Sequence, residues 1–348
     1  MMKPKRIKSS IALLIICLIV LAGFMIWNGS ILGKALPTPV KPTNSSPLVQ
    51  VTPGKPSAQQ PDLVPATPET TNSDEPTIAS QEGGGDPVCG GPPVMQILAL
   101  GVDPQEQTDA IRLVRVDFVT QQVSVLSIPR DLWVPIPGFT EHGINEYRIN
   151  AAYGYGEYFN GKGGGVVSFA NTLYANYDIT FDHYVVVHFD SFEKIIDQIG
   201  GVDITLDQPV DGTLQTLPYF STGTHHLDGA TALQFSRIRY PDNDAHRVDR
   251  QTMVIQSVIA KLKDPANFAL IPGLAISFLT DKSLITDLSL NDVSTLVCLT
   301  KKFDADSVTF HSIPAEMYTP TKAASGFFYD IPSPSVAQFV QDFWNGVR

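Results

Sequence analysis

One uncharged stretch near the N-terminus divides the chain. Ser9–Gly33 carries no charged side chain, and its core, Ile11–Trp27, is almost continuously apolar. As a helix, such a stretch would reach about 37 Å and could cross a hydrocarbon layer of about 30 Å. Four basic side chains precede it: Lys3, Lys5, Arg6 and Lys8. Because basic flanks favour the cytoplasmic side, we expect residues 1–33 to be a cytoplasmic tail and a single membrane anchor, with the rest of the chain outside the cytoplasm.

A cleaved secretory signal is the alternative interpretation of this stretch. Its apolar run is longer than the roughly 7–15 residues of a signal-peptide core, and no clear A-x-A cleavage site follows it. The sequence therefore favours an anchor that stays on the mature protein.

Residues 34–93 have the composition of a disordered linker. They hold 13 of the 27 prolines of the chain and are otherwise mostly Thr, Ser, Gln, Gly and small side chains. No apolar period of 2 or 3.6 runs through them, so we assign them no regular structure. Such a segment would let a folded domain move relative to its anchor.

Residues 94–348 have the patterns of an α/β domain, because strand-like and helical runs alternate along them. The expected strands are 94–100, 112–119, 122–128, 184–189, 202–206 and 307–312. The expected helices are 166–174, 190–199, 228–233, 247–262, 289–303 and 335–344. Strands mixed with helices indicate a sheet covered by helices.

The net charge and the number of cysteines exclude two classes of protein. A net charge of -11 argues against a nucleic-acid binder held by a general basic surface, so an anionic ligand would need a local cluster of cations. Three cysteines are too few for a disulfide-dense scaffold. Cys89 and Cys298 both lie beyond the anchor and could form one disulfide, although their positions in the sequence do not show that they are close.

Four arginines within 14 residues point to a phosphate site. Arg237 and Arg239 would share a side of an extended segment, and Arg247 and Arg250 would share a face at the start of a helix. Guanidinium groups pair with phosphate oxygens, and helix N-termini favour anions. These features suggest a phosphate or pyrophosphate site. The alternative is a salt-bridge network with nearby carboxylates: Asp242, Asp244 and Asp249.

Three other segments carry polar residues where strands end. Asp103 and Asp109 follow the first expected strand, in a loop where two carboxylates could hold Mg²⁺ or simply be solvated. Arg130 and Asp131 follow the third. The segment 148–153 precedes a glycine-rich stretch, whose backbone N–H groups could approach an anion; we favour a plain turn there.

In order and spacing, these motifs resemble the LytR–CpsA–Psr family of cell-envelope proteins, over about 97–261. The matching runs include LALGVDPQEQTDA, VSVLSIPRDLWV, RINAAYGYG, IGGVDITL, HLDGATALQFSRIR and DNDAHRVDRQ. The resemblance implies a three-layer α/β/α domain around a mixed central sheet, with an apolar pocket for a prenyl tail. It also implies a membrane-anchored phosphotransferase that moves a glycopolymer from a polyprenyl-pyrophosphate carrier onto peptidoglycan or another cell-wall acceptor.

The resemblance further implies residue roles. Asp103 and Asp109 look like the carboxylates linked to Mg²⁺. The residues that look like its pyrophosphate-binding set are Arg130, Arg237, Arg239, Arg247 and Gln251. Those that look like supporting site residues are Asp131, Asn150, Asp244 and Arg250. Either Asp131 or a metal-associated aspartate could be the general base.

One departure from the family pattern bears on catalysis. The family usually has an arginine two residues before the second aspartate, and Gln107 stands there. One phosphate contact is therefore lost or supplied by another residue, with Arg112 and Lys162 as candidates. Two other functions remain open: a lipid-pyrophosphate hydrolase, and a noncatalytic polyprenyl-glycan binder or regulator, which Gln107 mildly favours.

Overall fold

The computed structural model describes residues 86–239, 244–262, 284–300, 302 and 307–347. The expected anchor, 1–33, and nearly all of the expected linker lie outside these ranges. Among the described residues, no helix is both long and apolar enough to span a bilayer. Within the last part of the expected linker, η2 (Val88–Gly90) forms a short 3-10 turn.

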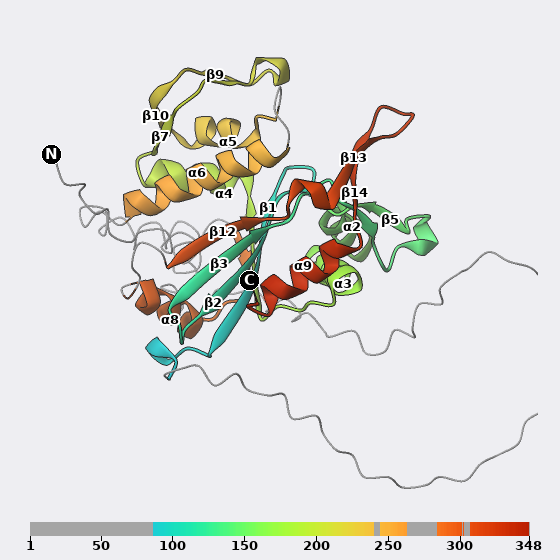
Figure 1. Ribbon diagram of the computed structural model, residues 1–348, viewed down its shortest axis with the longest axis horizontal. Helices are drawn as coiled ribbons and strands as arrows, with labels where there is room; N and C mark the ends of the chain where they lie inside the picture. Colours follow the sequence, from blue (N-terminus) through green and yellow to red (C-terminus); the bar gives the residue numbers. More distant parts are fainter. Residues whose placement is uncertain (1–85, 240–243, 263–283, 301, 303–306, 348) are drawn as a thin grey trace, which may run out of the picture.

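Six strands form one mixed sheet in the order β11-β6-β1-β2-β3-β12 (Figure 1). Their bounds are β1 (Val94–Val102), β2 (Thr108–Asp117), β3 (Gln122–Ser127), β6 (His183–His188), β11 (Leu284–Thr286) and β12 (Val308–Ser312). The β1–β6 and β3–β12 pairs are parallel, and the other pairs are antiparallel. The α/β interpretation is confirmed. Because β2 starts at Thr108, before the expected 112, Asp109 lies in a strand and not in a loop.

Helices cover both faces of this sheet. The helices on one face are α2 (Ala151–Asn160), α3 (Gly164–Tyr177) and α9 (Ser335–Trp344); Phe169 and Phe343 pack there with Leu98 and Leu113 of the sheet. The helices on the other face are α4 (Phe189–Gln198), α5 (Gly229–Arg237), α6 (Asp244–Leu262) and α8 (Leu290–Thr300). Alternating apolar side chains along each strand supply both cores, because successive side chains point to opposite faces.

The glycine-rich segment after Arg148 is mostly helical, and a turn is confined to residues 161–163 between α2 and α3, so our expectation of a plain turn is wrong for most of the segment. A Cβ on Gly156 of α2 would overlap the backbone oxygen of Gly164 in α3, so glycine lets the two helices approach closely. The carboxylate of Glu157 accepts hydrogen bonds from the backbone N–H groups of Gly163 (3.0 Å) and Gly165 (2.9 Å). The Glu157 carboxylate therefore occupies the N-terminus of α3, where an external anion could otherwise bind.

Short hairpins and turns complete the fold, and most of their strands escaped the sequence analysis; four of these strands have only two or three residues, too few to show a period. The two-stranded sheets are β4 (Trp133–Pro135) with β5 (Glu146–Arg148), β7 (Val202–Leu206) with β10 (Gly223–Leu227), β8 (Val210–Asp211) with β9 (Tyr219–Phe220), and β13 (Tyr318–Lys322) with β14 (Phe328–Pro332). The further 3-10 turns are η3 (Thr140–His142), η4 (Thr213–Gln215) and η6 (Ala315–Met317). Of these strands, β7 was expected.

A disulfide joins Cys89 of η2 to Cys298 of α8, with Cα atoms 5.7 Å apart. In addition, the N–H of Val88 donates to the backbone oxygen of Phe118 (3.0 Å), beyond the end of β2. Residues 88 and 89 are therefore fixed to the sheet and to α8 before the chain enters β1.

We expect the denatured, non-reduced chain to show one free thiol, Cys17, and the reduced chain to show three. Because the bond closes a long loop, Cys89→Ser should lower the free energy of unfolding by about 2–4 kcal/mol. Thiol titration and urea unfolding measure the two effects. Three free thiols before reduction would contradict the bond.

Candidate functional site

An apolar cavity of about 170 Å³ lies between the sheet and helices α4, α5 and α6. One water molecule needs about 10–15 Å³ on this scale, so the cavity has room for a ligand chain. Its apolar lining includes Ala99, Val114, Val125, Phe192, Ile195, Leu233, Val254 and Val258. Its polar lining side chains are Asp109, Arg112, Ser236, Arg237 and Gln251. Contacts connect four of these polar residues, Asp109, Arg112, Arg237 and Gln251. The polar side chains are therefore concentrated at one end of the apolar cavity.

A β-bulge places Asp109 at this polar end. Strands β1 and β2 pair regularly up to Gly101 and Ala110, and the next pair skips Asp109, which is the extra residue. A bulge changes the direction of the side chain it carries. As a result Asp109 lines the cavity together with Arg112, although the two are an odd number of residues apart in one strand.

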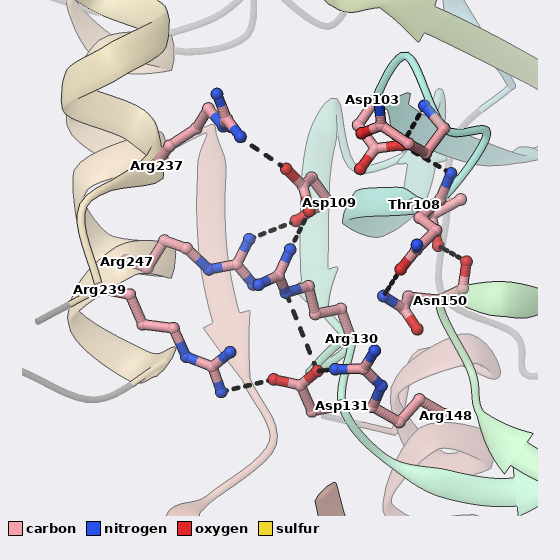
Figure 2. Close-up of polar contacts among 12 residues, drawn as sticks. Asp103, Thr108, Asp109, Arg130, Asp131, Arg148, Asn150, Arg237, Arg239 and Arg247 are labelled. Atoms are coloured by element: carbon pink, nitrogen blue, oxygen red, sulfur yellow. Dashed lines mark hydrogen bonds and ion pairs between the residues drawn. The ribbon is translucent and has the colours of Figure 1, made fainter. Parts of the chain in front are cut away.

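Three arginines from different parts of the chain converge on Asp109 (Figure 2). Arg130, just after β3, forms an ion pair with Oδ1. Arg237, the last residue of α5, brings its Nε to 4.0 Å from Oδ2. Arg247, near the start of α6, donates from Nη1 to the backbone oxygen of Asp109 (2.6 Å). Three of the predicted arginines thus meet around one residue of the central sheet.

A second carboxylate, Asp131, anchors the rest of the cluster and is only 1% exposed. Its Oδ2 accepts from Nη2 of Arg239 (2.5 Å), and its Oδ1 accepts from Nη1 of Arg148 (3.0 Å). The Nε of Arg130 lies 4.0 Å from Oδ1. Our expectation that Arg237 and Arg239 share one side of an extended segment is wrong: a helix ends at Arg237, and the two arginines contact different carboxylates.

Asp103 and Asn150 lie beside the cluster (Figure 2) and form a separate polar group with Gln107. Oδ1 of Asp103 accepts from the backbone N–H groups of Gln105 and Gln107, both at 2.9 Å, and so shapes the β1–β2 turn. Nδ2 of Asn150 donates to Oε1 of Gln107 (3.1 Å), and the backbone oxygen of Asn150 accepts from Thr108 N (3.0 Å). Gln107 therefore helps to hold the β1–β2 turn in place through its bonds to Asp103 and Asn150.

The remaining predicted residues have distinct positions. Arg250 is buried and donates to the backbone oxygen of Ile238 (2.5 Å), which holds α6 against the segment that carries Arg239. Gln251 accepts from Nη2 of Arg112 (3.2 Å) at the cavity. Asp242 and the side chain of Asp244 lie outside the described residues.

Two arginines at the site, Arg112 and Arg148, were not among our predicted binding residues. Arg112 was considered as a replacement for the missing family arginine, and it is buried and lines the cavity. Lys162, the other candidate, is exposed in the α2–α3 connection. Isolated arginines give no local signal in the sequence; the strand positions that bring these two to the site appear only in the fold.

Carboxylate oxygens at Asp103 and Asp109 are of the type that Mg²⁺ prefers. Oδ2 of Asp103 makes no hydrogen bond within the described ranges, which fits a carboxylate with one oxygen available to a cation. Among these residues, no three His, Cys, Asp or Glu side chains gather as a metal site. A cation here would therefore need oxygen ligands from solvent or substrate.

The arrangement defines a class of protein. Five guanidinium groups gather about Asp109 and Asp131, next to an apolar cavity that Asp109 and Arg237 line: Arg130, Arg148, Arg237, Arg239 and Arg247. Guanidinium groups bind phosphate oxygens, and the cavity suits hydrocarbon. The site fits an amphiphile with an anionic head and an apolar tail.

Comparison with known proteins gives the particular family. The LytR_cpsA_psr family model matches residues 74–342, so the chain belongs to the LytR–CpsA–Psr family. The resemblance stated from the sequence motifs is confirmed.

Individual relatives are distant. The regulatory protein MsrR of Staphylococcus aureus (strain COL) is 33% identical over 181 residues, 50% of each chain. The polyisoprenyl-teichoic acid–peptidoglycan teichoic acid transferase TagV of Bacillus subtilis (strain 168) is 33% identical over 175 residues, 49% of this chain and 42% of TagV. The matched segments thus span about half the length of these relatives or less.

Solved structures share the fold. The crystal structure of B. subtilis TagV superposes with a TM-score of 0.57 at 24% identity, over 73% of this chain and 96% of TagV. The structure of TagT bound to LIIa-WTA gives a TM-score of 0.55 at 26% identity, over 73% of this chain and 90% of that one. The mixed-sheet architecture is therefore that of the family.

We expect Asp131→Asn to lower the free energy of unfolding by about 3 kcal/mol, because it leaves Arg148 and Arg239 facing a neutral amide at a buried position. Urea unfolding measures the change. Asp249→Asn, at an exposed position on α6, is the control and should change it by less than about 0.5 kcal/mol. A loss below about 1 kcal/mol for Asp131→Asn would show that these ion pairs contribute little.

Proposed function

We propose that this protein is a membrane-anchored phosphotransferase that moves a glycopolymer from a polyprenyl-pyrophosphate carrier onto peptidoglycan or another cell-wall acceptor. One observation carries the proposal: a cluster of guanidinium groups stands at the polar end of an apolar cavity. A diphosphate joined to a prenyl chain has this distribution of charge and hydrocarbon. Family membership and the transferase name of TagV support it.

The arginines would bind the diphosphate and stabilise the leaving group. Arg130, Arg237 and Arg247 surround Asp109 at the cavity end, where phosphate oxygens would sit. An acceptor hydroxyl attacks the phosphorus next to the glycan and gives its proton to Asp103 or Asp109. The bond from that phosphorus to the bridging oxygen breaks, and polyprenyl phosphate leaves. Negative charge grows on the bridging oxygen in this step, and fixed guanidinium groups favour it.

Arg112 supplies the cation that the family pattern places at position 107. It lies on the sheet face of the cavity beside Gln251, while Gln107 is bound to Asn150. Asp131 fits a positioning role better than proton transfer, because both of its oxygens contact arginines. It would hold Arg239 and Arg148 in place for the substrate.

Mg²⁺ would be held by Asp103 and Asp109, with phosphate oxygens as further ligands. When bound, it would add positive charge next to the diphosphate. Asp109 would thereby connect the arginine cluster to the cation.

Residues 1–33 would anchor the protein in the cell membrane with a cytoplasmic N-terminus, and the linker would let the domain reach wall acceptors. A carrier lipid also lies in that membrane, so anchor and substrate share one surface. Nucleic acid is not a partner in this proposal.

Arg237→Gln should weaken the binding of geranyl diphosphate about 10–100-fold with little effect on thermal unfolding, because the side chain is 49% exposed and hydrogen bonds to charged groups contribute about 1.5–3 kcal/mol. Isothermal titration measures the affinity. Arg115→Gln is the matched control, since Arg115 on β2 pairs with Asp117 at the other end of the strand. Unfolding of Arg237→Gln, or unchanged affinity, would favour a purely structural role.

The reaction itself is tested with a polyprenyl-diphosphate-linked glycan and purified wall glycan, with Mg²⁺ or with EDTA. We expect a phosphodiester-linked product with Mg²⁺ and its loss in EDTA. Free phosphoglycan as the sole product would identify a hydrolase. Binding without any turnover would identify a noncatalytic binder.

A further inference from the structure

Four aromatic side chains form a continuous surface beside the arginine cluster. They are Trp133 of β4, Tyr147 of β5, Phe327 before β14 and Tyr329 of β14, here called the aromatic platform. The Trp133 ring centroid lies 5.3 Å from Tyr147 and 4.7 Å from Tyr329, and Tyr147 lies 5.5 Å from Phe327. The rings therefore touch one another across two separate hairpins, which stand next to each other in Figure 1.

The platform is coupled directly to the proposed diphosphate site. The guanidinium carbon of Arg148 lies 4.3 Å from the centre of the Phe327 ring, and the same guanidinium pairs with Asp131. The backbone N–H of Asp330 donates to the backbone oxygen of Asp131 (2.9 Å), which fixes β14 against this segment. A group attached to a diphosphate at the arginines would therefore extend toward these rings.

Exposure distinguishes the platform from ordinary core aromatics. Phe139 and Phe169 are buried, whereas all four platform rings are partly exposed. Within the described part of the chain, neither the indole N–H of Trp133 nor the hydroxyls of Tyr147 and Tyr329 donate to a protein group. The platform thus offers apolar ring faces together with polar tips that are open to a ligand.

This chemistry matches a saccharide. A pyranose ring has C–H groups that pack on aromatic faces and a rim of hydroxyls that exchange hydrogen bonds with polar tips. Rigid Trp and Tyr side chains provide such amphipathic contact at low conformational cost. Resting on the proposed function, we infer that the aromatic platform is a saccharide subsite of the transfer reaction, which receives a sugar ring next to the diphosphate.

The test uses the full chain in detergent and three probes: geranyl diphosphate, geranyl-diphosphate-linked N-acetylglucosamine, and soluble peptidoglycan glycan strands. Trp133→Leu should weaken at least one saccharide probe about five- to tenfold and leave the affinity for geranyl diphosphate unchanged. Tyr329→Phe, which keeps the ring and removes the hydroxyl, should weaken the same probe by a smaller factor. Tyr219→Leu, an exposed aromatic on β9, should change none.

The affected probe identifies the source of the sugar. A loss confined to the lipid-linked sugar assigns the platform to the donor glycan, and a loss confined to glycan strands assigns it to the acceptor. Unchanged saccharide affinities in folded Trp133→Leu and Tyr329→Phe would overturn the inference, even if geranyl diphosphate binds. If Trp133→Leu does not fold, Tyr329→Phe decides alone. Failure of the wild-type protein to bind geranyl diphosphate would instead contradict the proposed function. The diphosphate probe therefore distinguishes a wrong saccharide subsite from a wrong proposed function.

Discussion

The carboxylate of Asp109 meets arginines from three parts of the fold. Arg130 follows a sheet strand, Arg237 ends α5, and Arg247 lies in the first turn of α6. Like charges brought together inside a protein repel one another strongly unless carboxylates lie among them. Asp109 and Asp131 therefore make it possible for guanidinium groups to gather at one end of an apolar cavity. Binding of an anionic ligand would depend on this local cluster of arginines, because the chain as a whole carries a net charge of -11 and would repel an anion elsewhere.

The cavity and the arginine cluster have a common structural origin. Helices α4, α5 and α6 pack chiefly on one another and on the small β7–β10 sheet, and they cover the central sheet across the cavity. The ends of α5 and α6 then lie over the bulged start of β2. One packing arrangement thus provides both the apolar space for the hydrocarbon tail of a ligand and the arginines for its anionic head.

The aromatic platform extends this arrangement in the other direction. Arg148 contacts both Asp131 and Phe327, so it links the cations to the rings. The domain thus offers an apolar cavity, a cluster of arginines that reaches it through Arg237, and partly exposed aromatic rings that contact the cluster through Arg148. A lipid, a diphosphate and a sugar follow one another in the same order in the substrate class that we propose.

The sequence by itself determined the α/β class, five of the six strands of the central sheet and the family, because apolar periods and closely spaced motifs are local properties; it missed β11, which has only three residues. It also singled out the arginine-rich run before and within α6, since four arginines in 14 residues stand out in an acidic chain. Tertiary structure alone decided which carboxylate each arginine meets, that Asp109 lies in a bulged strand, and that the glycines after Arg148 allow two helices to approach closely. It alone decided the Cys89–Cys298 pairing and the roles of Arg112 and Arg148 at the site. These features depend on strand register and on contacts between residues far apart in the chain, and no local pattern encodes such contacts.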